Sequence, residues 1–126
     1  MTAPRFDSLP PGAGPRVQGF SGRDFRVDGK AYGAVLLTPE AATGWDAPDL
    51  DAIAAADVEA VLALDPPPEF LLLGTGAAMA FPPRAFVAAL EGKGIGVEAM
   101  DSRAAARTWG LLRGEGRWIA AALMPL

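Results

Sequence analysis

The second half of this 126-residue chain alternates strand-like and helix-like segments, and that order restricts the folds that it can adopt. Short apolar segments predict strands, and the segments between them have the periodicity and capping residues of helices. The expected strands cover residues 70–73, 95–100 and 117–123, and the expected helices cover residues 82–90 and 101–112. Such a β-α-β-α-β order favours a sheet covered by helices and connected by right-handed crossovers. The end of the last strand is apolar on both faces, which predicts an interior position in the sheet.

The first half predicts a small antiparallel meander ahead of this alternation. Apolar residues between Val17 and Leu37 are separated by two turn sequences, Ser21-Gly22-Arg23 and Asp28-Gly29-Lys30. The Asp-Gly pair is typical of hairpins because it accepts positive φ angles. Residues 32–38 predict a third strand, which Pro39 ends. The expected fold class is therefore α/β, a layered single domain with an N-terminal β-meander followed by a mixed central sheet covered by helices.

Length and proline distribution predict the domain organisation. A chain of this size buries roughly two-thirds of its unfolded surface, enough for one core. Residues 1–15 are rich in proline and poor in apolar residues, which predicts a flexible tail followed by a single domain over residues 16–126. Residues 39–53 predict no regular element and have Trp45 as their main apolar residue. Residues 54–64 predict a helix, which the prolines after Asp65 end.

Histidine and cysteine are both absent from the chain. Their absence excludes disulfides, thiolate nucleophiles, Ser-His-Asp triads and metal sites made of imidazole or thiolate ligands. No pair of carboxylates has the spacing of a general acid and a general base. The sequence therefore predicts a protein that is not an enzyme and that has no catalytic residues, no metal and no cofactor.

Charge and hydropathy bear on partners and location. The formal net charge of −4 argues against nucleic-acid binding and against attachment to anionic lipid. The best apolar run, residues 53–64, is too short to span a bilayer and contains Asp57 and Glu59. The first residues lack the apolar core of a secretory signal. We expect a cytoplasmic protein with no transmembrane segment; peripheral membrane association and the oligomeric state stay open.

The segment LLLGTGAAMAF, residues 71–81, holds the first candidate site. A strand followed by Gly74 and Gly76 is similar to the start of a dinucleotide-binding fingerprint. Met79 occupies the third glycine position, however, and Pro82 places the next helix late. The alternatives are a tight loop, or a small-molecule or anion pocket at the carboxyl end of a strand. The candidate ligand-binding residues of that pocket are Gly74, Thr75, Gly76, Asp101, Ser102 and Arg107.

Glu98 is the second candidate. It stands among apolar residues of an expected interior strand, where a buried carboxylate needs a partner. A structural ion pair is the favoured explanation, in which Arg107 pairs with Glu98 or, instead, with Asp101, and catalysis is the alternative. Arg103 and Arg113 are expected to be solvated, rather than to form a basic site for an acidic partner.

The helix predicted after Asp101 also carries features without an assigned role. Trp109, in this helix, and Trp118, after it, fit the core, a subunit interface or an exposed protein-binding patch. Gly110 has low helix propensity and predicts that the helix ends or bends there.

Several segments, taken in order, resemble one family. They are YGAVLLTP (32–39), Trp45, EFLLLGTG (69–76), GIGVEAMDSRAAARTWGLL (94–112) and EGRWIAAALMP (115–125). Together they resemble a small α/β domain family, formerly of unknown function, that includes the mitochondrial NADH:ubiquinone oxidoreductase complex assembly factor three and the adipogenesis-associated domain protein. The resemblance implies a layered α/β fold with a mixed central sheet and no established enzymatic activity. It also implies that the chain is related to a mitochondrial member, which acts together with a second assembly factor in building the peripheral arm of respiratory complex I.

The chain departs from the family pattern in its last long segment. Relatives often have Thr, Cys, Tyr and Asn where this chain has Ser102, Ala106, Trp109 and Gly110. The chain thus lacks the amide that is the best polar group of that motif. A thiol at position 106 cannot be essential to any role that this chain shares with those relatives.

The residues favour a non-catalytic binding or assembly module. The resemblance places it in a largely uncharacterised bacterial family and implies that the module assists the assembly of respiratory complex I. The implied partners are proteins, either complex I subunits or another assembly factor. The alternative is a small-molecule or anion-binding protein, or a weak enzyme, that uses the pocket around Gly74-Thr75-Gly76.

Overall fold

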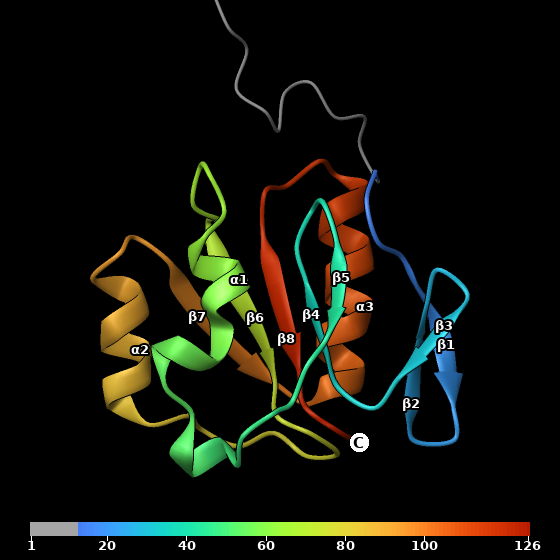
Figure 1. The fold of residues 1–126 in the computed structure, drawn as a ribbon, viewed down its shortest axis with the longest axis horizontal. Coiled ribbons are helices and arrows are strands. Elements are labelled where there is room, and N and C mark those ends of the chain that lie inside the picture. Colours follow the sequence, from blue (N-terminus) through green and yellow to red (C-terminus); the bar gives the residue numbers. More distant parts are fainter. Residues whose placement is uncertain (1–12) are drawn as a thin grey trace, which may run out of the picture.

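A computed structural model describes residues 13–126, which form two β-sheets with covering helices (Figure 1). The larger sheet has the strand order β5-β4-β8-β6-β7. Its strands are β4 (Val35–Leu37), β5 (Ala42–Gly44), β6 (Phe70–Gly74), β7 (Gly96–Met100) and β8 (Ala120–Leu123). β6 pairs in parallel with β7 and β8, whereas β4 pairs antiparallel with β5 and β8. The predicted α/β class with a mixed sheet is confirmed, and so is the interior position of the last strand.

The smaller sheet is the predicted antiparallel meander, in the order β1-β2-β3. Its strands are β1 (Val17–Ser21), β2 (Asp24–Val27) and β3 (Lys30–Tyr32). The prediction of one strand over residues 32–38 is wrong, because a bend at residues 33–34 divides it between β3 and β4. The three residues of β4 are all buried, because β4 lies inside the larger sheet, between β5 and β8.

The described helices are α1 (Glu59–Leu62), α2 (Arg84–Glu91) and α3 (Ser102–Gly114), together with two short 3-10 helices, η2 (Leu50–Ala52) and η3 (Ala55–Val58). The helix predicted over residues 54–64 is instead η3 followed by a single turn of α1. The Asp57 carboxylate accepts the backbone N–H of Ala54 at 2.8 Å, and the Asp57 carbonyl accepts Trp45 Nε1 at 2.9 Å. The segment predicted to be irregular, residues 39–53, contains β5 and η2.

Helix α3 passes through Gly110 without ending there. Buried Trp109 and Arg113 on either side keep this part of the helix packed against the sheet. Packing therefore outweighs the roughly 1 kcal/mol that a glycine costs inside a helix.

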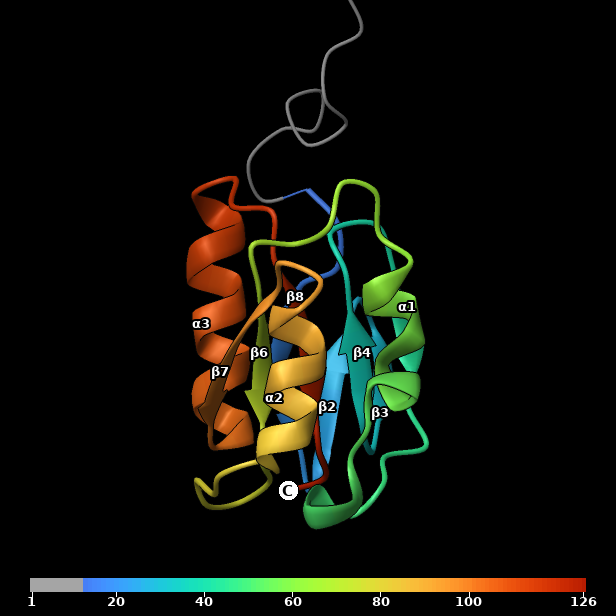
Figure 2. The ribbon, with the colours of Figure 1, turned by 90° about the vertical axis from the view of Figure 1, so that its left-hand side faces the viewer.

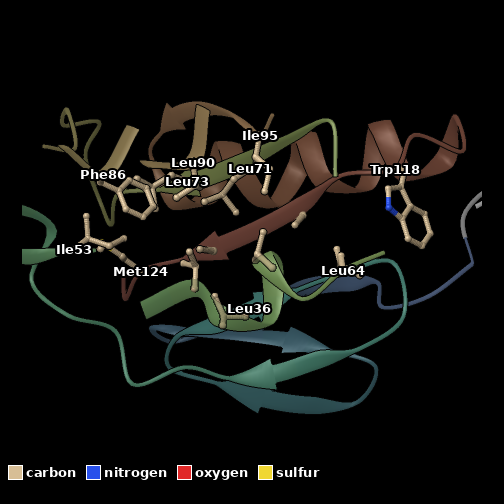
Figure 3. Packing of buried hydrophobic residues seen from close by; sticks show 14 residues of the cluster. Leu36, Ile53, Leu64, Leu71, Leu73, Phe86, Leu90, Ile95, Trp118 and Met124 are labelled. Atoms are coloured by element: carbon tan, nitrogen blue, oxygen red, sulfur yellow. The ribbon is translucent and has the colours of Figure 1, made fainter. Parts of the chain in front are cut away.

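Two layers of packing enclose the larger sheet. α1 and α2 lie on one face, while α3 and the smaller sheet lie on the other (Figures 1 and 2). Alternate residues of β6 divide between them, since Leu71 and Leu73 join the cluster under α1 and α2, and Leu72 joins the cluster under α3. Figure 3 shows Leu71 and Leu73 beside Phe86 and Leu90 of α2. This packing fixes α2 beside β7, at the outer side of the sheet.

Candidate functional site

The carboxyl ends of β6 and β7 meet the start of α3 in a polar cluster, here called the strand-end cluster. It consists of Gly74, Thr75, Gly76, Asp101 and Ser102. Backbone hydrogen bonds join its parts: Thr75 N–H donates to Met100 O, and Ser102 N–H donates to Gly76 O, both at 2.8 Å. The structure thus brings together five of the six residues predicted for a ligand pocket.

Ser102 is the centre of the strand-end cluster. Its side chain is fully buried, and its Oγ accepts the N–H of Gly76 and donates to the carbonyl of Met124, each at 2.8 Å. The hydroxyl has a single proton, so it has no further donor for a ligand. Ser102 therefore joins three segments of the chain: the loop after β6, the start of α3 and the end of β8.

Gly74 has a packing role in this cluster. A Cβ at this position would lie 2.7 Å from Ser102 Oγ, 2.8 Å from Ser102 Cα and 3.0 Å from Leu123 Cδ2. The missing side chain lets α3 approach β6 closely. The space that a phosphate would need beside a fingerprint glycine is thus taken by the chain itself.

Thr75 Oγ1 and Asp101 Oδ1 also bond to the backbone of the chain. Thr75 Oγ1 lies 2.7 Å from Ala78 O and 3.2 Å from Met100 O, which share its proton, and it accepts the N–H of Ala80 at 3.0 Å. Asp101 caps α3, since its Oδ1 accepts the N–H of Ala104 at 2.8 Å. The strand-end cluster holds loops and a helix start in place.

Arg107, the sixth predicted pocket residue, lies apart from the other five. It is exposed on α3, more than one turn beyond Ser102, and borders a hollow of about 220 Å³ beside β1. The ion pairs of residues 13–126 do not include one between Arg107 and either Glu98 or Asp101. The expectation of a pair with Glu98 rested on an interior strand, whereas β7 is the edge strand and Glu98 is exposed to water.

Arg113 corrects a second expectation, because it is buried and not solvated. Its Nη1 donates to Arg117 O, and its Nη2 donates to Ala13 O at 2.9 Å. Burial lowers the pKa of Arg113 below its usual value. The guanidinium thereby attaches the segment before β1 to the end of α3, a structural task.

Both tryptophans in question are core residues. Trp109 is fully buried and donates from Nε1 to Pro15 O at 3.1 Å, while buried Trp118 donates to Pro66 O at 2.7 Å. Residues 1–12 of the predicted tail lie outside the described residues, but Pro15 is buried. The alternative of an exposed tryptophan patch is thereby removed.

Other arginines make surface contacts. Arg117 forms an ion pair with Glu69, Nε to Oε2 at 3.1 Å, and hydrogen bonding to this carboxylate raises the pKa of Arg117. Arg103 places its guanidinium carbon 5.5 Å from the centre of the Phe20 ring. Neither contact forms a basic site of the kind that could bind an acidic partner.

A groove between α2 and β7 lies at the edge of the sheet and has a volume of about 730 Å³. We call it the edge groove. Apolar side chains dominate its lining, and two of them stand in the loop before α2: Met79 is 45% exposed and Phe81 is 83% exposed. Sequence reasoning missed this site, although two large apolar residues in a loop bounded by Gly76 and Pro82 were a signal that could have indicated it.

Charged groups border the edge groove as well. Arg84 lies at the start of α2, Glu91 at its end, and Glu98 lies on β7. None of the three takes part in an ion pair within residues 13–126. The groove therefore combines an apolar floor with charges available to a partner.

No helix in residues 13–126 has both the length and the apolar character needed to cross a membrane. Over the same residues, no three carboxylates gather closely enough to hold a metal ion.

Known proteins are similar to this chain over most of its length. An uncharacterised protein of Rhodobacter capsulatus is 35% identical over 111 residues, 87% of this chain and 84% of that protein. NADH dehydrogenase (ubiquinone) 1 alpha subcomplex assembly factor 3 of Danio rerio is 32% identical over 114 residues, 90% of this chain and 66% of that protein. A crystal structure of a Bordetella parapertussis protein matches with a TM-score of 0.81 and 32% identity, covering 90% of this chain and 98% of that one.

The family predicted from the sequence segments and their order along the chain is thereby confirmed, since an assembly factor 3 is among the relatives. Residues 17–124 match the family described as "Protein of unknown function (DUF498/DUF598)", which is nearly all of the described chain. This protein therefore belongs to the DUF498/DUF598 family.

Proposed function

We infer that this protein is a non-catalytic protein-binding module that assists the assembly of respiratory complex I. The observation that carries the inference is the 32% identity, over 90% of the chain, to an assembly factor of NADH dehydrogenase. The partners would be subunits of complex I or a second assembly factor. We place the protein in the bacterial cytoplasm, where it could meet those subunits before they join the membrane complex.

The chemistry of the strand-end cluster supports binding over catalysis. The hydroxyls of Ser102 and Thr75 and the carboxylate of Asp101 all bond to the backbone of the same chain. A small-molecule or anion pocket at Gly74-Thr75-Gly76 would need these groups to be free. Arg107, which would supply its positive charge, lies apart from them.

Deletion of the gene and affinity purification of the tagged protein test the proposal together. We expect the tagged protein to enrich complex I subunits or an assembly factor. We expect membranes of the deletion strain to lose NADH:ubiquinone reductase activity and to keep succinate oxidation, which serves as the control for general respiratory damage. If no such protein is enriched and NADH oxidation is intact, the proposal is wrong.

A further inference from the structure

β7 leaves one long side of the larger sheet open. It is the outermost strand of the order β5-β4-β8-β6-β7, and its outer edge lies between α2 and α3 (Figure 2). All five of its residues pair with β6 without a bulge, and none is a proline. The opposite edge strand, β5, has three residues. Proteins commonly protect exposed edges by shortness, bulges, prolines or charged side chains, and of these β7 has only one charged side chain, Glu98.

The hydrogen bonds of β7 show which of its backbone groups face outward. Gly96 N–H donates to Glu69 O at 3.3 Å, and Met100 O accepts the N–H of Thr75 at 2.8 Å. In a parallel pair, alternate residues bond to the same neighbouring strand. Glu98 shares the orientation of Gly96 and Met100, so Val97 and Ala99 direct their N–H and C=O groups away from β6. No hydrogen bond among residues 13–126 occupies these outward groups.

The edge groove runs beside these open groups. Val97 packs with the cluster under α2, and Ala99, two residues on, shares its face of the sheet. Met79, Phe81 and Val87 supply more apolar surface on that side. An added strand could therefore bond to the edge of β7 and place every second side chain in the groove.

Charge distinguishes between two kinds of strand that could be added. Glu98 borders the edge groove at the strand edge, but its side chain is exposed on the opposite face of β7 from that of Val97, and it has no ion-pair partner in the described chain. Glu91, on the groove side, is also unpaired within residues 13–126. A second copy of β7, paired antiparallel about its middle residue, would bring the two Glu98 carboxylates together, which is unfavourable. Lysine or arginine beside Glu98 is favourable by the same rule.

We propose that the edge of β7 and the edge groove bind an extended segment of a partner protein by strand addition. Apolar side chains of that segment fill the groove beside α2, and alternate basic side chains lie beside Glu98. Backbone bonds to Val97 and Ala99 supply affinity, and the alternation of side chains supplies selectivity. This inference deepens the proposed function, on which it rests, by stating where a partner binds and which chemistry it presents.

The test uses the full chain and two capped octapeptides, one alternating Val with Lys and the other alternating Val with Glu. We expect the Val/Lys peptide to slow amide hydrogen exchange of Val97 and Ala99 and to bind at least about fivefold more tightly than the Val/Glu peptide. Ala99→Pro removes an outward N–H that β6 does not use, so the variant should fold and lose binding of the Val/Lys peptide. Glu98→Lys should reverse the preference between the two peptides.

A matched control separates local from general charge effects. Glu115→Lys makes the same change of charge at the exposed end of α3 and should leave the Val/Lys preference unchanged. Equal binding of both peptides, or binding that Ala99→Pro and Glu98→Lys leave intact, would overturn the proposal. So would a dimer of the full chain that Ala99→Pro dissociates, because the occupant would then be a second copy.

Affinity purification with the same variants separates this inference from the proposed function. If the unmodified chain enriches complex I subunits and both β7 variants do so equally, the binding surface is wrong and the proposed function stands. If both variants lose those subunits while Glu115→Lys retains them, the surface is supported. If even the unmodified chain enriches none and deletion leaves NADH oxidation intact, the proposed function fails.

Discussion

The Ser102 hydroxyl joins two parts of the chain that are far apart in sequence. Its partners are the N–H of Gly76 and the carbonyl of Met124, and all three groups are shielded from water. A serine at a helix start predicts a capping role. Here Asp101 caps the helix, and the Ser102 hydroxyl instead connects the loop after β6 to the end of β8. Sequence identifies the residue as polar and well placed, whereas its partners depend on the path of β8.

Replacing Ser102 by alanine should therefore destabilise the fold strongly. The variant leaves a buried N–H and a buried C=O without their partner, which costs about 2–4 kcal/mol of the free energy of unfolding. Urea unfolding at equilibrium measures this loss in the free energy of unfolding. Ser21→Ala, at an exposed position of β1, is the control and should change stability by less than about 0.5 kcal/mol. Equal losses in the two variants would show that the hydroxyl contributes nothing special.

Glu98 and Arg113 show why individual charges are hard to place from sequence. Apolar neighbours predict a buried Glu98, but burial of a strand depends on its position in the sheet, and β7 is at the edge. A helix-terminal arginine predicts a solvated Arg113, but it is buried, with two of its nitrogens donating to the carbonyls of Arg117 and Ala13 and its Nε left without a hydrogen bond. Both outcomes depend on distant segments that local sequence does not describe.

Most of the helices and strands in the second half of the chain were predictable from sequence. Apolar runs give β6, β7 and β8, and prolines and Asp101 mark where α2 and α3 begin. Strand order is a different matter, because local periodicity does not determine it. The first half was less predictable, since η3 and α1 replace one expected helix and β5 lies in a segment without a strand pattern.

Glycines in two different elements should respond in opposite ways to alanine. Gly110 lies in α3, and a methyl group added there would meet no atom within 4 Å, so Gly110→Ala should stabilise the protein by about 0.5–1 kcal/mol. Gly74→Ala would press a methyl group on Ser102 and should destabilise it by about 1–3 kcal/mol. Thermal unfolding of both variants tests whether their stabilities change in these opposite directions. A stabilising Gly74→Ala would contradict the close approach of α3 and β6.

The whole molecule has two apolar clusters that share one sheet. Trp109 belongs to the cluster under α3, and Trp118 to the cluster under α1 and α2. Because β4, β6 and β8 contribute side chains to both, loss of one cluster should remove the support of the other. The single domain predicted from sequence should then unfold as one cooperative unit.

Two variants that each retain one tryptophan test whether the two apolar clusters unfold together. One keeps Trp109 and the other keeps Trp118, with phenylalanine at the remaining tryptophan positions. In each variant the fluorescence midpoint in urea should coincide with the midpoint of the far-ultraviolet circular dichroism signal. A Trp109 signal that changes at clearly lower urea than the circular dichroism would mean that the α3 side unfolds separately.

The position of β8 in the larger sheet affects how the protein is made. β8 covers residues 120–123, later in the chain than every other strand, yet it lies between β4 and β6 and connects the antiparallel half of the sheet to the parallel half. Synthesis proceeds from the amino end, so both halves are made before the strand that joins them. A nascent chain cannot insert β8 until that strand has left the ribosome. The sheet is therefore completed last at its centre, and until then two unfinished edges need protection from other chains.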